Sequence, residues 1–272
     1  MAALRRRRLG RTGLMVTELG LGAMDTPTSA EGAATIEAAL DHGIDFIDTA
    51  REYAGSEQLI GQVLRARGGD SVHVATKTFS RTINSSQWDV DRSLRTLGVD
   101  RIALYQLHDV STPEAWKQVM GEGGALEGLK VAQFRGLVGH IGISSHDLGI
   151  AREAILSGEF DTIMLEYSAF YRESAPLIEL AGERDIGVII MRPLGGSGRT
   201  TTMRGRIAGG YDGPLTPANL LRYVLSNPGI SVAIPGARYP SRIHDNVATA
   251  LSYEPMDEAE RRALERAAAE LY

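Results

Sequence analysis

The strongest constraint on the fold is a regular alternation of short apolar runs with helical segments along almost the whole chain. The apolar, strand-like runs lie near residues 19–21, 45–48, 72–76, 102–107, 139–143, 161–166, 187–191 and 231–234. Segments with helical spacing follow near residues 32–42, 56–66, 87–97, 113–135, 148–157, 174–184, 216–226 and 241–250. Eight strand–helix units without a break in composition predict an α/β protein with one closed (β/α)8 TIM barrel, a single domain over residues 1–272.

Several segments stand outside this repeat. Arg5 to Arg8 and Met15 to Thr17 are separated by glycine-containing residues 10–13, which predicts an N-terminal β-hairpin that closes the bottom of the barrel. An alanine- and charge-rich stretch near 257–271 predicts an extra C-terminal helix. The segment 195–217 holds seven glycines and has no clear periodicity, so we expect a loop there.

Two finer expectations concern the helices. Three glycines, at positions 121, 123 and 124, are expected to split the fourth helical segment. Trp88 lies on the third helical segment and is expected to belong to the core.

The composition excludes several classes of function. The sequence contains no cysteine, which excludes disulfides, thiolate catalysis and cysteine-ligated metal sites. Its six histidines show no paired-ligand spacing, so we expect no metal site. A net charge of −5 predicts no nucleic-acid partner, and the absence of an apolar run of about 18 residues predicts no membrane span. Since no apolar signal-peptide core follows the N-terminus, we expect a cytoplasmic protein. We also expect a monomer or a simple homo-oligomer.

Polar residues stand at successive strand ends in the first half of the chain. Asp48, Lys77 and His108 each end an apolar run, and Tyr53 lies five residues after Asp48. Taken alone, such an aspartate is often a helix cap and such a histidine a core residue. The C-terminal ends of parallel barrel strands converge on one mouth, however, where active sites of this fold lie. We therefore predict that these four side chains form a catalytic site.

The chemistry of these four residues suits proton transfer to a carbonyl oxygen. The Lys77 ammonium would lower the pKa of the Tyr53 phenol, and Asp48 would orient the lysine. His108 would position the carbonyl, and a nicotinamide cofactor would supply the hydride. An alternative is a barrel aldolase or isomerase in which Lys77 forms a Schiff base.

Longer motifs resemble those of one known family. Gly43-Ile-Asp-Phe-Ile-Asp-Thr-Ala-Arg-Glu-Tyr53, Leu104-Tyr-Gln-Leu-His108, Ile141-Gly-Ile-Ser-Ser145 and Ile234-Pro-Gly-Ala-Arg238 resemble the signatures of aldo-keto reductases. The resemblance extends from about Leu9 to Asn246. It implies reduction of a small-molecule aldehyde or ketone, or the reverse, with Tyr53 as the acid. It also implies a short bacterial member without a cysteine-rich iron–sulfur domain. The rival within the family is a cofactor-binding regulatory or scaffold barrel without turnover.

The resemblance further implies positions that bind NADP(H), with NAD(H) as the alternative cofactor. Gly22 and Ala23, together with Asp48, would lie beside the nicotinamide ribose, and Ser144 and Ser145 would hold the carboxamide. The other implied positions are Leu194 and Gly196 for the pyrophosphate, and Arg238, Arg242 and Asn246 for the adenosine end. Four implied cofactor-binding positions depart from the residues common in the family, namely Ser145, Met164, Met191 and Gly236. Arg192, next to Met191, is a further implied position.

Overall fold

An eight-stranded parallel sheet forms the centre of the computed structural model, which describes residues 3–68 and 71–271. The strands are β3 (Leu21–Gly22), β4 (Phe46–Asp48), β5 (His73–Thr78), β6 (Ile102–Leu107), β7 (Val138–Ser144), β8 (Thr162–Glu166), β9 (Gly187–Met191) and β10 (Val232–Ala233). They follow one another around the sheet in chain order. Parallel backbone bridges, from Leu19 to Ala233 and from Gly22 to Gly236, join the two ends of the sheet. The predicted (β/α)8 barrel is confirmed.

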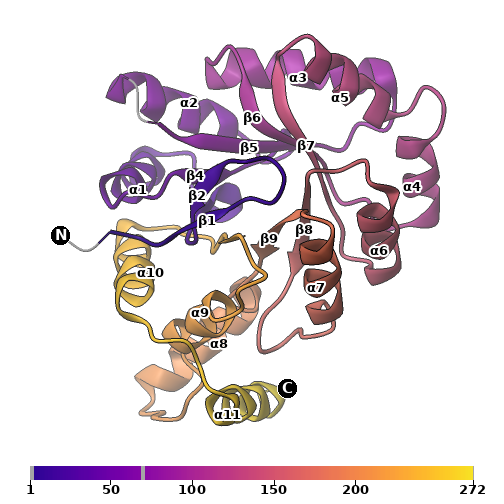
Figure 1. Ribbon diagram of the computed structural model, residues 1–272. Coiled ribbons are helices and arrows are strands. Elements are labelled where there is room, and N and C mark those ends of the chain that lie inside the picture. The colour runs from indigo at the N-terminus through magenta and orange to yellow at the C-terminus, as the bar shows by residue number, and fades with distance from the viewer. Residues whose placement is uncertain (1–2, 69–70, 272) are drawn as a thin grey trace.

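Helices surround the strands (Figure 1). In chain order they are the short 3-10 helix η1 (Ala23–Asp25) and the α-helices α1 (Ala30–Asp41), α2 (Ser56–Arg67), α3 (Ile83–Leu97), α4 (Pro113–Met120), α5 (Ala125–Phe134), α6 (Leu148–Ser157), α7 (Ala175–Glu183), α8 (Gly196–Ala208), α9 (Pro217–Leu225), α10 (Pro240–Ser252) and α11 (Glu258–Ala269). Glycines divide the fourth helical segment into α4 and α5, as the sequence predicts. Among the described residues, no helix combines the length and apolar character that a membrane crossing needs.

The core has two layers because successive side chains of a strand point to opposite faces of the sheet. In β4, Phe46 faces the barrel interior, where it packs with Ala75 and Leu104, whereas Ile47 faces the helices. Side chains alternate in the same way along β5 and β6 toward their C-terminal ends. It therefore places every second residue near the strand ends inside the mouth of the barrel.

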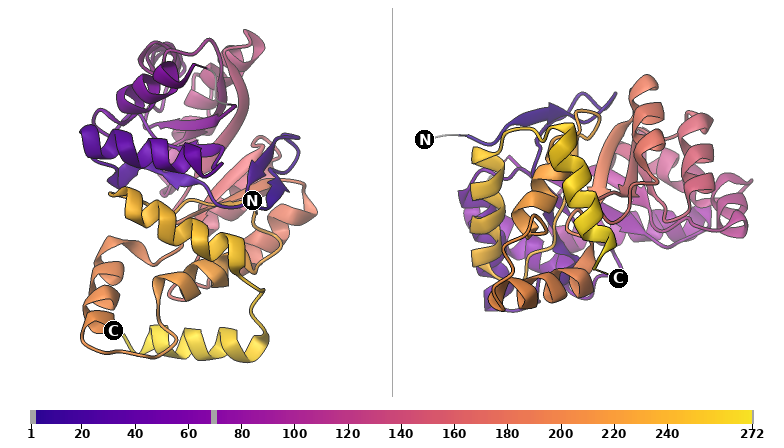
Figure 2. Two further views of the ribbon diagram at one scale, coloured as in Figure 1. Left: turned by 90° about the vertical axis from the view of Figure 1, so that its left-hand side faces the viewer. Right: turned by 90° about the horizontal axis from the view of Figure 1, so that it is seen from below.

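The N-terminal hairpin closes the bottom of the barrel. Strands β1 (Arg6–Arg8) and β2 (Met15–Thr17) pair in antiparallel fashion. Leu9 and Val16 from this hairpin are fully buried in the interior cluster. The hairpin (indigo) and the last helix α11 (yellow) lie outside the strand–helix repeat in Figure 2. Both extra elements confirm the sequence prediction.

Two local predictions are wrong. The glycine-rich segment expected as a loop forms α8, whose only fully buried side chain among the described residues is Met203. A helix that packs through one apolar residue shows no 3.6-residue pattern, and its sequence is rich in glycine, so neither signal identified it. Trp88 on α3 is 61% exposed and does not belong to the core. The amphipathic pattern of α3 is satisfied instead by Val90 and Leu97, which are fully buried.

Candidate active site

The four strand-end side chains meet at the C-terminal mouth of the barrel. Asp48 of β4 and Lys77 of β5 follow interior-facing residues by two positions, and so does Gln106 of β6. Lys77 and Gln106 are register partners in the sheet. His108 directly follows β6, and Tyr53 lies in the loop between β4 and α2. Strand alternation and parallel register thus bring together the residues that the sequence singles out.

Lys77 is held by three oxygen atoms at the centre of this group. Its Nζ donates to Asp48 Oδ2 at 2.6 Å, to the Thr49 carbonyl oxygen at 2.8 Å and to the Tyr53 hydroxyl at 3.5 Å. Lys77 is 1% exposed and Asp48 is 3% exposed. Burial raises the pKa of Asp48, while the charge and hydrogen bond of Lys77 oppose that rise. The pair is therefore a buried ion pair whose two members depend on each other.

The Tyr53 phenol does not titrate as the sequence suggests. Its pKa is raised, first because the phenol is buried and then because the carboxylates of Asp48 and Glu52 disfavour a phenolate. The net pKa of Tyr53 is therefore raised, whereas the sequence predicts that the neighbouring Lys77 lowers it. The Lys77 ammonium, 4.9 Å from the centre of the Tyr53 ring, is already committed to the Asp48 carboxylate. Tyr53 thus holds its proton firmly and is available as a donor.

His108 lies against Tyr53 and two residues that sequence reasoning missed. The Tyr53 and His108 rings meet edge to face, with centroids 5.6 Å apart. Phe79 stacks on the face of the imidazole at 4.2 Å, and Glu52 Oε2 lies 2.9 Å from His108 Nδ1. Glu52 directly precedes Tyr53, and that adjacency to a candidate catalytic residue was the one signal in the sequence.

Gln106 is a further member of the site that the sequence analysis missed. Its Nε2 donates to Asp48 Oδ1 at 3.3 Å, and the side chain is fully buried. Among the described residues, its Oε1 atom has no hydrogen-bond partner. Its position two residues before His108 on the same strand would have indicated an interior-facing side chain.

The residues predicted at the nicotinamide end occupy the rim of the same mouth. Gly22 lies on the barrel seam, bridged to Gly236, and Ala23 follows it in η1. A β-carbon on Gly22 would lie 2.7 Å from the Ile234 carbonyl oxygen, so the close strand contact requires glycine. Ser144, Ser145, Met191 and Arg192 lie at or directly after the C-terminal ends of β7 and β9, whereas Met164 lies in the middle of β8.

The two serines at the end of β7 are buried and already bonded. Ser144 Oγ accepts from the Asp109 backbone N–H at 2.9 Å, and Ser145 Oγ donates to the Asp147 carbonyl oxygen at 3.0 Å. Met164 is 2% exposed within the interior cluster. Arg192 has φ of 51° and pairs with Glu166 at 3.1 Å. These contacts fix the rim residues through local bonds.

The residues predicted at the adenosine end lie on or next to α10, and those predicted for the pyrophosphate lie at the N-terminus of α8. Arg238 precedes α10 and lies 3.6 Å from Asp25, with its side chain 60% exposed. Arg242 lies in the first turn of α10 and pairs with Asp245 at 3.3 Å. Helix α8 begins at Gly196, whose φ is 85°. Leu194 and Asn246 are buried and support these segments from beneath.

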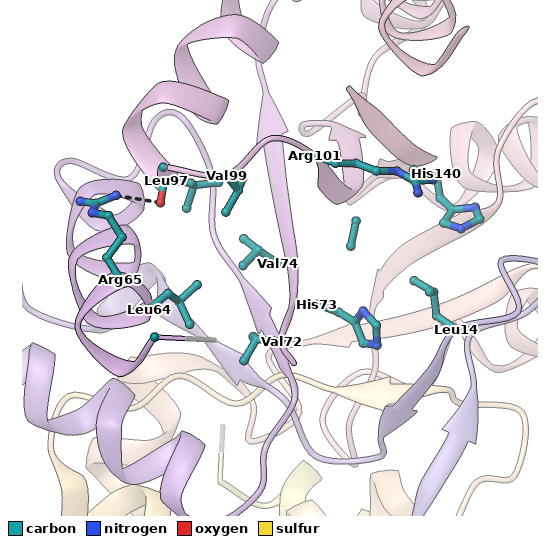
Figure 3. Close-up of a pocket in the computed structure, with 14 residues that line it drawn as sticks. Leu14, Leu64, Arg65, Val72, His73, Val74, Leu97, Val99, Arg101 and His140 are labelled. Carbon is teal, nitrogen blue, oxygen red and sulfur yellow. Dashed lines mark hydrogen bonds between the residues drawn. The ribbon is translucent and has the colours of Figure 1, made fainter. Parts of the chain in front are cut away.

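A cavity of about 520 Å³ lies at the other end of the barrel. It is lined by residues near the N-terminal ends of β5, β6 and β7, among them His73, Arg101 and His140 (Figure 3). None of the four strand-end residues of the mouth lines it. In parallel barrels this end contributes to stability, whereas catalytic residues lie at the opposite end. We therefore place the candidate active site at the mouth.

The strand order and the four polar side chains that meet at the mouth define the class of protein, a (β/α)8 barrel with a candidate active site at the C-terminal ends of its strands. The sequence model described as "Aldo/keto reductase family" matches residues 18–212. The chain belongs to the aldo/keto reductase family and is an oxidoreductase of that family.

Individual relatives agree with this assignment. The chain is 26% identical to "Uncharacterized oxidoreductase YqkF" of Bacillus subtilis over 287 residues, which covers 91% of each protein. It resembles the holo form of the aldo-keto reductase AKR11C1 from Bacillus halodurans with a TM-score of 0.81 and 23% identity, covering 97% of this chain and 96% of that one. An aldo-keto reductase from Klebsiella pneumoniae, solved in complex with NADPH, gives a TM-score of 0.76 at 22% identity, covering 97% and 95%.

Proposed function

We propose that this protein reduces the carbonyl group of a small aldehyde or ketone with NADPH, or catalyses the reverse oxidation, with Tyr53 as the proton donor. One observation carries the proposal. A single buried lysine contacts both Asp48, at 2.6 Å, and the Tyr53 hydroxyl, at 3.5 Å, beside His108. A general acid must be protonated at the working pH, and a nearby cation stabilises the negative charge that remains after the proton has left. This cluster offers both.

The step is a transfer of hydride and proton to one carbonyl. A bound nicotinamide cofactor supplies the hydride to the carbonyl carbon. As the C=O double bond becomes a single bond, the oxygen takes the proton of the Tyr53 hydroxyl, which leaves a phenolate. The Lys77 ammonium already donates toward that hydroxyl and stabilises the phenolate. Asp48 keeps the lysine charged and oriented.

Several features of the rim suit a dinucleotide. The guanidinium groups of Arg238 and Arg242 stand at the N-terminus of α10, a position where helix dipoles favour phosphate. Helix α8 presents the N–H groups of its first turn after two glycines with positive φ, Gly195 and Gly196. Among the described residues, a β-carbon on Gly196 would meet only the Arg192 side chain, at 3.9 Å, which leaves space above this turn for a ligand. The NADPH complex of the Klebsiella pneumoniae protein supports the same choice of cofactor.

We expect the protein to bind NADPH more tightly than NADH. Arginine binds the 2′-phosphate through charge-assisted hydrogen bonds, each contributing about 1.5–3 kcal/mol, which corresponds to roughly a tenfold to hundredfold preference. Quenching of tryptophan fluorescence on titration with each cofactor measures both affinities. Arg238→Ala should reduce the difference between the NADPH and NADH affinities more than Arg242→Ala does, because we assign Arg242 partly to adenine stacking. Equal affinities for the two cofactors in the wild type would refute a phosphate-reading role for either arginine.

A matched control separates a specific contact from a general loss of positive charge. Arg152 is an exposed arginine on α6, outside the predicted cofactor residues. Arg152→Ala should leave both affinities at wild-type values. If it narrows the difference as much as Arg238→Ala does, the preference arises from net charge and not from a phosphate contact.

The rival assignment as a Schiff-base enzyme makes the opposite prediction for Lys77. A nucleophilic lysine must expose an uncharged amine, whereas the Lys77 Nζ is buried and bonded to a carboxylate and a carbonyl. Treatment with borohydride in the presence of a carbonyl substrate should therefore trap no adduct at Lys77. Peptide mass spectrometry measures this directly, and a mass increase mapped to Lys77 would favour the aldolase.

The regulatory or scaffold alternative predicts cofactor binding without turnover. A panel of aldehydes and ketones, with absorbance of the reduced nicotinamide as the readout, distinguishes it from the enzyme. A single domain, a cytoplasmic location and a monomeric or simple homo-oligomeric state remain predictions from the sequence.

A further inference from the structure

Glu52 holds the imidazole of His108 from one side while two aromatic rings enclose it. Glu52 Oε2 lies 2.9 Å from His108 Nδ1, and Oε1 accepts the backbone N–H of Phe79 at 2.9 Å. Phe79 stacks on the imidazole with an interplanar angle of 18°, and the Tyr53 ring approaches it edge-on at 82°. The same carboxylate therefore fixes both the histidine and the phenylalanine that packs against it.

The charge of Glu52 determines which ring nitrogen of His108 carries the hydrogen. Burial acts against ionisation of Glu52, yet the hydrogen bonds from His108 and from the Phe79 N–H lower its pKa overall. An ionised carboxylate only accepts hydrogen bonds. The nitrogen facing Glu52 must then carry a hydrogen, since two acceptors at 2.9 Å would repel each other.

We infer that Glu52 is a positioning residue that fixes His108 as the Nδ1–H tautomer and leaves Nε2 as the nitrogen available to a reactant. The tautomer is inferred from the geometry alone, whereas its consequence for catalysis rests on the proposed function. In this form neutral His108 accepts a hydrogen bond from an alcohol at Nε2. It donates to a carbonyl oxygen only after Nε2 binds a second proton.

The tautomer that Glu52 selects therefore sets the hydrogen-bonding role of His108 Nε2 in the site. The titratable and charged groups around His108 are Glu52 and Tyr53 from the loop before α2, Asp48 from β4 with its partner Lys77 from β5, and Arg81, whose guanidinium donates to the His108 backbone carbonyl oxygen at 2.9 Å. Glu52 is the one carboxylate that contacts the imidazole itself among the described residues.

Nitrogen-15 NMR of the histidine side chains in the full-length protein tests the tautomer directly. The His108 signals are assigned by their loss in His108→Gln. At a pH where His108 is neutral, we expect a pyrrole-type shift for Nδ1 and a pyridine-type shift for Nε2. Glu52→Leu removes both acceptor oxygens at similar volume, and the Nδ1–H preference should then disappear. A wild-type ring protonated at Nε2, or an unchanged Nδ1–H ring in Glu52→Leu, would overturn the inference.

Kinetics supply the second readout. Outer partners that orient metal-bound histidines contribute roughly tenfold to hundredfold to activity, and by analogy Glu52→Leu should lower kcat for reduction by about that factor. An unchanged kcat for reduction would contradict the role of Glu52.

Two controls keep the outcomes distinct. Glu159→Gln removes a surface carboxylate paired with Lys130, and it should change neither the NMR shifts nor the rates. Circular dichroism and thermal unfolding show whether Glu52→Leu is folded, and Glu52→Gln replaces it if not. The amide introduced by Glu52→Gln retains one acceptor oxygen for two N–H donors, so the Phe79 and His108 bonds compete and the tautomer becomes mixed. If the wild type shows the Nδ1–H ring but reduces no carbonyl, the proposed function fails while the tautomer stands.

Discussion

Tyr53→Phe should slow carbonyl reduction by about two to four orders of magnitude while leaving cofactor affinity unchanged. The phenol is the proton donor of the proposed reaction, and its raised pKa keeps it protonated at neutral pH. Phenylalanine has the same ring, so the edge-to-face contact with His108 is retained and only the hydroxyl is lost. Absorbance of the reduced nicotinamide measures turnover, and fluorescence quenching measures cofactor binding.

Tyr105→Phe provides a matched control for this variant. Tyr105 lies on β6, faces the helices and lies 3.1 Å from the Ser93 hydroxyl, away from the mouth. Loss of that buried hydroxyl should cost about 1 kcal/mol of stability and leave turnover intact. Near-wild-type turnover of a folded Tyr53→Phe enzyme would end the assignment of Tyr53 as the acid.

Lys77→Met should produce the largest loss of stability among the site variants. The substitution leaves the Asp48 carboxylate buried without its ammonium partner. Breaking a buried ion pair by removing one partner costs about 3–5 kcal/mol. Urea unfolding at neutral pH measures this difference in the free energy of unfolding. Activity should be lost as well, because no cation remains to stabilise the Tyr53 phenolate.

The pH dependence of this destabilisation follows from Asp48. Burial raises its pKa, and without Lys77 less opposes that rise, so the pKa increases further in the variant. Folding raises the pKa of such a carboxyl. The group therefore destabilises the folded state at a pH above its folded-state pKa, and it has no effect at a pH below its unfolded-state pKa. The stability gap to the wild type should therefore shrink as the pH falls toward 3.8, the ordinary value for aspartate.

A double variant separates stability from catalysis. Lys77→Met/Asp48→Asn removes the stranded charge as well, so it should recover most of the lost stability without recovering activity. The ion-pair explanation is contradicted if the stability difference between the wild type and Lys77→Met does not depend on pH. It is also contradicted if the double variant is no more stable than Lys77→Met. Recovery of activity together with stability would show that Lys77 has only a structural role.

The sequence by itself determined the barrel and the convergence at its mouth. Both depend on periodic features, because strand alternation and parallel register place side chains at fixed intervals along the chain. Asp48, Lys77 and His108 stand at strand ends, so their meeting followed from the order of the strands. The hairpin and the division of the helix at residues 121–124 followed from glycines and short apolar runs in the same way.

Only the tertiary structure decided the features that depend on contacts between distant segments. Helix α8 forms although its sequence is rich in glycine, because Met203 packs into the core. The contact of Glu52 with His108 joins residues 56 positions apart. The raised pKa of Tyr53 arises from burial and from neighbouring carboxylates. Burial and through-space charge depend on which segments pack together, and a local sequence pattern carries no record of that packing.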